Sequence, residues 1–432
     1  MRGSLSALVL LALASSCTRT PTWETDVRPL MAGSCQGCHV EGGIAPFALT
    51  TYEQAVAMKD DIVAATKNRT MPPYLAGPNC AEYADDQRLS DEQIAMLENW
   101  AKGGTPKGTP DPKIAIPEAP SNSLPRVDLQ ISMPQTYTPT KSPDDYRCFV
   151  IDWPAQVDQY VTGFNVMPGN PRVVHHVIAF LIPPEKTQAI VDLDAADPAE
   201  GYTCFGGPGG NPVGISWLGS WAPGGMARMY PEDTGILARP GSKVVMQVHY
   251  NTSAAPEGER DDLTRIEIAL ADSVKKRAFL MPWADPDWVR MHQMPILANA
   301  KDTEHSFALD PTQYMSYLTQ NQLPNGTGFR VYAAALHQHL LGTSSRLQIN
   351  RADGTSECLL DIPRWDFHWQ RSYRLSQTKI FHPNDLLQVS CHWDNSAEAQ
   401  PIVGGVKQET RDVNWGEGTT DEMCLGLVYI SE

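Results

Sequence analysis

The spacing of apolar residues changes along the chain, from a helical pattern in the first hundred residues to short, separate runs beyond them. Between residues 52 and 68 apolar side chains recur at helical spacing, which predicts a helix with one buried face. A second helix is expected to begin at Ser90, where Ser-x-x-Gln forms a capping box, and to end at Gly103. This part of the chain therefore predicts a small all-α domain over residues 18–108.

Beyond Arg126 the pattern is that of a β protein. Short apolar runs alternate with Pro, Gly, Asn and Asp, without a long helical period. The clearest runs are residues 173–182, 243–250, 265–270, 328–336, 346–350 and 425–430. Such runs predict antiparallel, jelly-roll-like sandwiches. About three hundred residues exceed one domain of roughly 100 to 150 residues, so we expect two all-β sandwich domains, at 126–275 and 276–432.

A proline-dense stretch separates the two patterns. Residues 109–125 contain few large apolar side chains, and such a composition favours an extended, semi-rigid spacer over a packed element. We place the linker between the all-α domain and the first sandwich there.

The N-terminus resembles an export signal. Arg2 is followed by an apolar run and then by small residues before Cys17, which is the order of a signal peptide of the lipoprotein type at 1–17. Lipidated Cys17 would anchor the protein to a membrane, at the periplasmic or cell surface; ordinary signal cleavage is the alternative. No other stretch has eighteen continuous apolar residues, so we expect no transmembrane helix.

The balance of charge excludes one class of partner. The net charge is -16, and no run of Lys and Arg supplies the basic patch that nucleic-acid phosphates require. We expect no DNA or RNA partner.

Cys35-x-x-Cys38-His39 is the attachment signature of a c-type haem. The two thiols would bind the haem vinyl groups, and His39 would be an axial iron ligand. The alternative is a redox-active Cys-x-x-Cys with an unrelated histidine. Met71, in a proline-stiffened loop, is the expected sixth ligand; Met31 and Met58 are weaker candidates. Residues 23–108 resemble the class I-type cytochrome c domains of exported bacterial oxidoreductases.

Two groups of histidines in the β-rich part have the spacing of metal ligands. His337 and His339 are two residues apart, so on a strand both side chains face one metal. The thioether of Met423 would make that site soft, which suits Cu(I) better than zinc. A His-x-His pair by itself is more often a coincidence.

The other group is His175, His176 and His249. Adjacent residues on a flat strand point to opposite sides, so His175 and His176 can share one metal only if the strand bulges or their rings turn back. His249 would complete an all-imidazole site, and Gln247 shares its strand face. Without such a metal, one histidine of the pair would lie in the core and the other at the surface.

These motifs occur in the order seen in the copper type II, ascorbate-dependent monooxygenases, which residues 127–429 resemble. The resemblance implies two copper ions, one per sandwich. His175, His176 and His249 would hold the electron-transfer copper, whereas His337, His339 and Met423 would hold the copper where O2 reacts with a C–H bond.

Nine cysteines in an exported chain should mostly be bonded to each other or to a cofactor. The resemblance implies two disulfides, Cys148 with Cys204 and Cys391 with Cys424. Cys80 and Cys358 then remain, either paired with each other or as thiols.

The chain also departs from the family. In its peptide-amidating members an Arg and a Tyr grip the substrate carboxylate, and the corresponding residues here are Ala335 and Leu427. We therefore expect a less polar small organic substrate. Gln247 matches a residue near the family's electron path, or is an ordinary exposed strand residue. Five other histidines are not expected to bind catalytic copper: His292, His305, His368, His382 and His392. His368 lies in an aromatic run and is expected to pack in a core or an interface.

The expected function is that of an exported copper-dependent monooxygenase that uses O2. Electrons would pass through the chain's own haem from an external donor, either ascorbate or a periplasmic redox protein. The alternatives are a haem and copper electron-transfer or copper-binding protein without oxygenase turnover, and a copper-free interaction sandwich.

Overall fold

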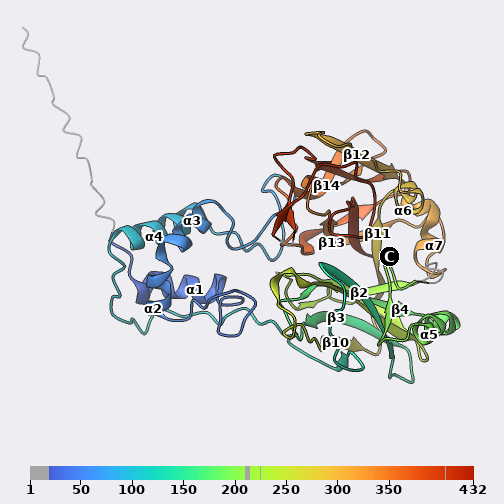
Figure 1. Ribbon diagram of the computed structural model, residues 1–432, viewed down its shortest axis with the longest axis horizontal. Helices are drawn as coiled ribbons and strands as arrows, with labels where there is room; N and C mark the ends of the chain where they lie inside the picture. Colours follow the sequence, from blue (N-terminus) through green and yellow to red (C-terminus); the bar gives the residue numbers. More distant parts are fainter. Residues whose placement is uncertain (1–18, 210–214, 224, 404) are drawn as a thin grey trace, which may run out of the picture. The chain divides into compact units, whose positions relative to one another are not determined.

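The computed structural model describes residues 19–209, 215–223, 225–403 and 405–432 (Figure 1). The expected signal peptide and Cys17 lie outside these residues. The chain divides into two compact units. One comprises the chain up to Glu41, Phe47–Pro72 and Leu89–Ala119; the other comprises Gly42–Pro46, Pro73–Arg88 and Pro120–Glu432. Among the described residues no helix is both long and apolar enough to cross a bilayer.

All regular secondary-structure elements in the described residues of the first unit are helices. They are η1 (Trp23–Val27), α1 (Arg28–Ser34), α2 (Tyr52–Ala57), α3 (Lys59–Lys67) and α4 (Asp91–Lys102). As predicted, Ser90 and Gln93 form the capping box of α4, and Gly103 ends it. The helix predicted over 52–68 is instead two helices, because Met58 leaves the helical conformation between α2 and α3. Trp23, Leu97 and Trp100 lie in the core between these helices.

The expected all-α domain at 18–108 is not continuous. Residues 73–88 belong to the β-rich unit, where the rings of Tyr74 and Tyr83 are buried against Tyr373. Cys80 is bonded to Cys358 in the same region. Residues 73–88 belong to the β-rich unit because the rings of Tyr74 and Tyr83 are buried in its apolar core.

The β-rich unit is built from twenty named strands among the described residues. They are β1 (Leu129–Ser132), β2 (Asp144–Asp152), β3 (Gln159–Met167), β4 (Val174–Ile182), β5 (Tyr202–Thr203), β6 (Ser216–Trp221), β7 (Arg228–Met229), β8 (Thr234–Ala238), β9 (Lys243–Asn251), β10 (Arg265–Ala271), β11 (Lys276–Trp283), β12 (Thr303–Leu309), β13 (Phe329–His337), β14 (Gly342–Asn350), β15 (Ser356–Ile362), β16 (Tyr373–Phe381), β17 (Leu386–Trp393), β18 (Ile402–Val403), β19 (Val406–Lys407) and β20 (Leu425–Ser431). Short helices connect them: η2 (Pro184–Lys186), α5 (Thr187–Ala196), η3 (Thr252–Ala254), α6 (Pro286–Met291), η4 (Pro311–Tyr314) and α7 (Met315–Leu318).

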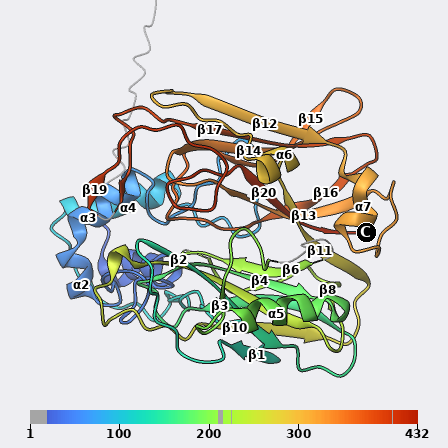
Figure 2. The same cartoon turned by 45° about the vertical axis from the view of Figure 1, so that its right-hand side comes forward.

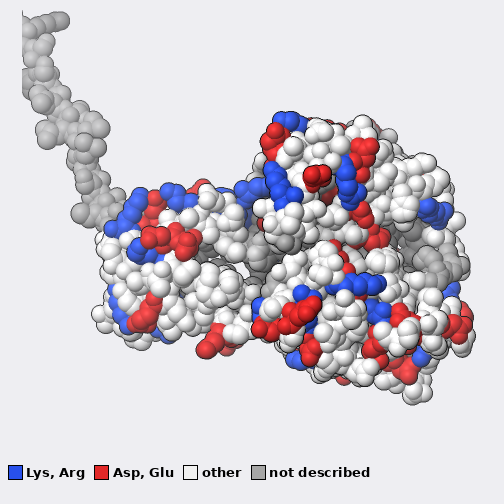
Figure 3. All heavy atoms as spheres, in the orientation of Figure 1, with Lys and Arg blue, Asp and Glu red and all other residues white. Residues whose placement is uncertain are grey.

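Two layered halves result, as the sequence predicted (Figure 2). In the N-terminal half the sheet β5-β2-β9-β4-β6 packs on β1, β10, β3 and β8, around Phe149, Val177 and Ile266. In the C-terminal half β12-β17-β14-β15 packs on β11, β20, β13 and β16 around its own apolar core. Acidic and basic side chains are interspersed on the face of this unit that Figure 3 shows.

The halves are less separate than two independent sandwiches would be. β8 and β11 pair in parallel, with Lys276 opposite Thr234, and join both halves in one nine-stranded sheet. Side chains alternate between the faces of a strand, so Phe279 lies in the C-terminal core while its neighbour Ala278 lies in the N-terminal core. The expected boundary between 275 and 276 therefore falls at the start of a shared strand.

Candidate metal centres

His175, His176 and His249 converge at the middle of the five-stranded sheet. His176 on β4 lies opposite His249 on β9, and the register shifts between Val174 and His176. This irregularity corresponds to a bulge, the first of the two alternatives that the sequence left open for the His175-His176 pair. The Nδ1 atom of His176 lies 3.4 Å from that of His175 and 3.3 Å from that of His249.

The three nitrogens are suited to one metal ion. An ion bound at about 2.0 Å with tetrahedral angles needs its nitrogen ligands about 3.3 Å apart, which agrees with these separations. Burial lowers the pKa of His175, His176 and His249, so their imidazoles are neutral and have lone pairs to offer. Imidazole ligands accept copper and zinc alike, so this trio does not by itself select the metal.

Contacts on β2 orient His249. Its Nε2 atom lies 2.9 Å from Oδ1 of Asp144, which leaves Nδ1 facing the other two histidines. The ring of Tyr146 stacks on the His249 ring, with centroids 4.1 Å apart and planes 8° from parallel. Carboxylate partners of this kind fix the orientation of a ligating histidine. Asp144 and Tyr146 belong to no motif, and only their spacing of two residues on a strand hinted at a shared face.

His337 and His339 form the second group, at the end of β13. Their ring centroids are 5.0 Å apart. His337 Nδ1 lies 2.5 Å from Oε1 of Gln370, and His339 Nδ1 lies 3.1 Å from the carbonyl oxygen of Asp421. Both histidines therefore keep Nε2 for a metal. Burial lowers the pKa of His337 to about 4 and that of His339 well below its usual value, so these rings are neutral too.

The segment that carries Met423 lies beside this pair. Met423 is buried, between Glu422 and the disulfide-bonded Cys424. The Glu422 side chain accepts hydrogen bonds from the backbone N–H groups of His339 and Leu341, at 2.9 and 2.7 Å, and from the Trp393 indole. Burial raises the pKa of Glu422 to about 7. Glu422 thus ties the Met423 segment to the turn that carries the two histidines.

The two histidine groups face each other across the two halves. The ring centroids of His176 and His337 are 6.2 Å apart. Phe367 lies in the same region, stacked on His175 at 4.5 Å and edge-on to His339 at 5.8 Å. One histidine group thus lies in each half, and the two groups are close neighbours.

The aromatic run was only partly interpreted from the sequence. In the run that contains Phe367 and His368, Phe367 is buried and contacts His175 and His339. The His368 side chain is 74% exposed and lies 3.0 Å from Asp366. The prediction that His368 packs in a core was therefore wrong, and packing in an interface stays a prediction. Gln247 is not an exposed strand residue, because it is buried and donates a hydrogen bond to the Gly207 carbonyl.

The remaining histidines have polar partners of their own. His292 contacts the Trp415 carbonyl and His305 that of Pro295, while His382 and His392 lie beside acidic side chains. Among the described His, Cys, Asp and Glu side chains, the trio of His175, His176 and His249 is the one cluster with metal-ligand spacing.

The haem-attachment residues lie directly after α1. The backbone N–H groups of Cys38 and His39 both donate to the Cys35 carbonyl, so the three residues share one tight turn. His39 Nδ1 lies 3.1 Å from the Phe47 carbonyl, which leaves Nε2 for an iron ion. Cys35 and Cys38 belong to none of the three disulfides. The two cysteines and the imidazole thus lie together on one turn, as the attachment signature requires, and the choice between haem and a redox-active pair stays a prediction.

The candidate methionine ligands differ in burial. Met71 is half-buried in the turn after α3, whereas Met31 is fully buried in α1 and packs in the helical core. Met58 is half-buried and packs against that core. Met71 therefore has the least packing role of the three.

All six other described cysteines are paired. The disulfides are Cys148–Cys204, Cys391–Cys424 and Cys80–Cys358. The first two confirm the expected pairing, and the third settles the alternative left open for Cys80 and Cys358. Three disulfides indicate an oxidising compartment outside the cytosol.

Residues 310–431 match the family model described as copper type II ascorbate-dependent monooxygenase, C-terminal domain. The chain is 26% identical to human dopamine beta-hydroxylase, over 74% of the chain and 48% of that protein. It is 24% identical to tyramine beta-hydroxylase of Caenorhabditis briggsae, over 70% and 48%, and 23% identical to human DBH-like monooxygenase protein 1, over 61% and 40%. The chain thus spans about half the length of the curated relatives it matches.

Solved structures add nothing to this picture. The major capsid protein P2 of bacteriophage PM2 aligns with 70% of the chain and 97% of its own, at 9% identity and a TM-score of 0.25. The sequence similarities support a relationship of the β-rich part to the copper type II monooxygenases.

Proposed function

We propose, on the basis of this relationship, that the protein is a copper-dependent monooxygenase that hydroxylates a C–H bond of a small organic substrate with O2. The observation that carries the proposal is the convergence of five neutral histidines from the two halves, beside the segment of Met423; His249 and His339 are buried and the other three are half-buried. In this proposal His175, His176 and His249 hold one copper ion through Nδ1. His337 and His339, through Nε2, and Met423 hold the other.

Copper would supply one-electron transfer at the first site and reaction with O2 at the second, where a thioether favours Cu(I). The chain's own groups hold the ligands in place. Asp144 and Gln370 orient His249 and His337 through the ring nitrogens that face away from the metals. Phe367 and Tyr146 cover the histidine rings with aromatic surface and thereby exclude water.

The proposed substrate is one without a carboxylate to be clamped. Ala335 and Leu427 lie directly opposite each other on β13 and β20. Ala335 lies on the same strand face as His337, two residues away. This pair supports an apolar substrate group beside the second site. The relatives named dopamine and tyramine beta-hydroxylase act on the amines in their names, and we carry over only the small organic character.

The helical unit would supply electrons. In the proposal Cys35 and Cys38 attach one c-type haem, His39 is its axial ligand and Met71 its second one. An external donor, ascorbate or a periplasmic redox protein, would reduce it. We also propose that the protein is exported and held at a membrane through Cys17, in agreement with its disulfides.

Metal content and turnover of a Met423→His variant test the oxygenase assignment. Wild-type protein should carry two copper ions per haem and form a product that contains one atom from O2. The variant should keep its copper but lose product, because a third imidazole removes the soft ligand. Met315→Leu, at a buried methionine of the same core, is the matched control.

The outcomes separate the alternatives. If the protein binds copper but forms no oxygen-dependent product, it is an electron-transfer or copper-binding protein. If it binds no copper, it is an interaction sandwich. Stopped-flow mixing of reduced protein with O2 tests the haem. If haem oxidation never follows copper reoxidation, the haem does not supply the electrons.

A further inference from the structure

Residues 416–422 form one short loop that contacts the surroundings of both histidine groups. The Gly416 N–H donates to the Glu422 carbonyl at 3.1 Å, which closes the neck of the loop. Inside it, the Asp421 N–H donates to the Gly418 carbonyl at 2.8 Å, and the Gly418 N–H donates to the Asp421 carboxylate at 3.2 Å. Because these hydrogen bonds tie the loop together, a displacement of one of its residues displaces the others.

On one side the loop is bound to the proposed ligands of the second site. The Asp421 carbonyl lies 3.1 Å from His339 Nδ1, and the Glu422 carboxylate accepts the His339 N–H at 2.9 Å. Met423 follows in the chain, and the next residue, Cys424, is fixed by its disulfide. The position of this end of the loop therefore determines where the His339 ring and the Met423 backbone lie.

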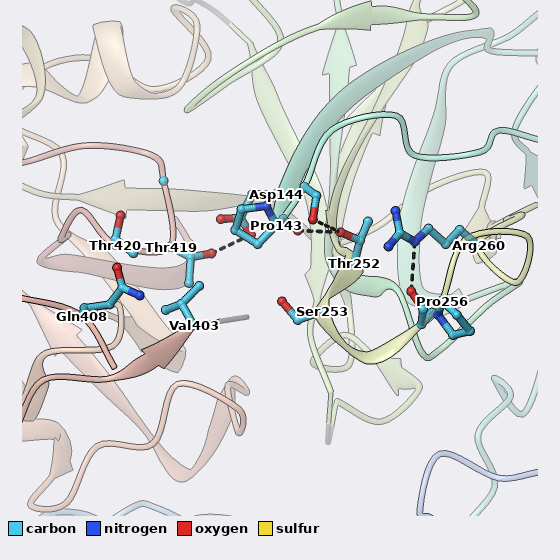
Figure 4. A pocket seen from close by; sticks show the side chains of 13 residues that line it. Pro143, Asp144, Thr252, Ser253, Pro256, Arg260, Val403, Gln408, Thr419 and Thr420 are labelled. Carbon is cyan, nitrogen blue, oxygen red and sulfur yellow. Dashed lines mark hydrogen bonds between the residues drawn. The ribbon is translucent and has the colours of Figure 1, made fainter. Parts of the chain in front are cut away.

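On the other side the loop is bound to the two residues that orient His249. The Thr419 hydroxyl donates to Oδ1 of Asp144 at 2.7 Å, from the C-terminal half to the N-terminal half (Figure 4). The Tyr146 hydroxyl donates to the Glu417 carbonyl at 2.6 Å. Asp144 and Tyr146 contact the His249 ring by a hydrogen bond and by stacking. Each of these two links thus reaches His249 through a single residue.

Two effects of opposite sign connect the histidine groups. Like-charged ions in neighbouring sites repel each other through space, which opposes their simultaneous binding. The loop acts in the other direction. An ion that fixes the His249 ring also orders Asp144 and Tyr146, and through them the loop. The second ion then has less conformational freedom to remove when it binds.

We propose that the 416–422 loop couples the two metal sites, so that an ion at one site strengthens binding at the other. Thr419 acts on His249 through Asp144 and is therefore a positioning residue. The proposal rests on the function proposed above, in which both sites bind copper, and adds that the loop favours their joint filling. Joint filling matters because hydroxylation with O2 takes two electrons, and protein with a single copper ion holds only one of them at its metal sites.

Copper binding measures the coupling without turnover. Full-length protein is dialysed against graded concentrations of Cu(I) under argon, and the bound copper is counted by elemental analysis. Each site is also measured alone, in a His175→Ala, His176→Ala double variant and in a His337→Ala, His339→Ala double variant. The two-ion binding constant of the intact protein, divided by the product of the two single-site constants, is the coupling factor. Repulsion between the ions is common to all loop variants, so a change in this factor isolates the loop.

Thr419→Val should lower the coupling factor about fivefold or more, because valine keeps the shape of threonine but cannot donate the hydrogen bond. Thr419→Ser keeps the hydroxyl and should restore the factor. Tyr146→Phe removes only the hydroxyl that binds the loop, so it should act in the same direction as Thr419→Val. Thr420→Val is the matched control, since the Thr420 hydroxyl lies 3.4 Å from Nη2 of Arg411 in its own half.

An unchanged coupling factor in Thr419→Val and in Tyr146→Phe would overturn the proposal and leave the proposed function intact. An equal loss in Thr420→Val would also overturn it, since general loosening of the loop would then explain the change. If one variant loses its near-UV circular dichroism and is unfolded, the other decides. Protein that binds no copper at either site would overturn the proposed function together with the coupling. Loss of oxygenase product with an intact coupling factor would concern the proposed function alone.

Discussion

At the scale of single residues, buried carboxylates at the contact between the halves make stability depend on pH. The Glu417 side chain contacts Gly206, and the Tyr146 hydroxyl donates to the Glu417 carbonyl at 2.6 Å. Burial raises the pKa of Glu417 from 4.5 to about 7. The folded chain therefore holds this proton more tightly than the unfolded chain. Its stability should fall as the pH rises from about 4.5 to 7.

A Glu417→Gln variant removes the part of this dependence that is due to Glu417, whereas Glu422, whose pKa is also raised to about 7, keeps its own part. We expect the variant to match wild type below pH 5 and to be more stable above pH 7, by on the order of 2 to 3 kcal/mol. Denaturant midpoints measured across this pH range check the prediction. Glu257→Gln, at an exposed position of the same unit, is the control. Parallel curves for wild type and Glu417→Gln would show that the buried carboxyl does not titrate in this range.

At the scale of elements, the segment 73–88 is attached to the C-terminal half by packing and by one covalent bond. Tyr74 and Tyr83 lie 5.2 and 5.4 Å from the Tyr373 ring, between centroids, and Cys80–Cys358 closes a loop of 278 residues. Closure of a long loop restricts the unfolded chain strongly. The double variant Cys80→Ala with Cys358→Ala should lower the unfolding free energy of the β-rich unit by about 2 to 4 kcal/mol.

Limited proteolysis locates the effect. Cleavage within 73–88 should become faster in the double variant, since only the tyrosine packing then holds the segment. A variant that lacks Cys148 and Cys204 should leave that cleavage rate unchanged, because its disulfide joins β2 to the chain after β5. If proteolysis of 73–88 is unaltered in the first variant, the rings alone anchor the segment.

At the scale of the whole molecule, two units with separate cores should unfold separately. The helical core contains Trp23 and Trp100, and the other tryptophans of the chain belong to the β-rich unit. Copper bound only to the folded state stabilises it by about 4 kcal/mol at a thousandfold excess over the dissociation constant. Removal of copper by a chelator should therefore destabilise the β-rich unit alone.

Two optical signals distinguish the units. In guanidinium unfolding, chelation should lower the midpoint of tryptophan fluorescence and leave that of the haem Soret band in place. Chelation of a His176→Ala variant should have a smaller effect, because one site is already weakened. A Soret midpoint that shifts together with the fluorescence would indicate that the units unfold as one.

Local chemistry was readable from the sequence. Cys35, Cys38 and His39 lie within five consecutive residues, and His337 and His339 share a face through the alternation of a strand. The capping box at Ser90 is also a property of a few consecutive residues and was confirmed, and of the two alternatives for the His175-His176 pair the register shift corresponds to the bulge. The disulfides of Cys148 and Cys391 followed from the resemblance to a family.

Long-range contacts were decided only by the tertiary structure. Gln370 carries no local signal, and Asp144 and Phe367 carry only a strand spacing and an aromatic run. They reach the histidines because strands and loops far apart in the chain pack together. The shared sheet through β8 and β11 depends on which strand edges meet. The chain order indicated which side chains are candidate metal ligands, whereas packing between distant segments determined what surrounds them, because apolar burial is set by the whole fold.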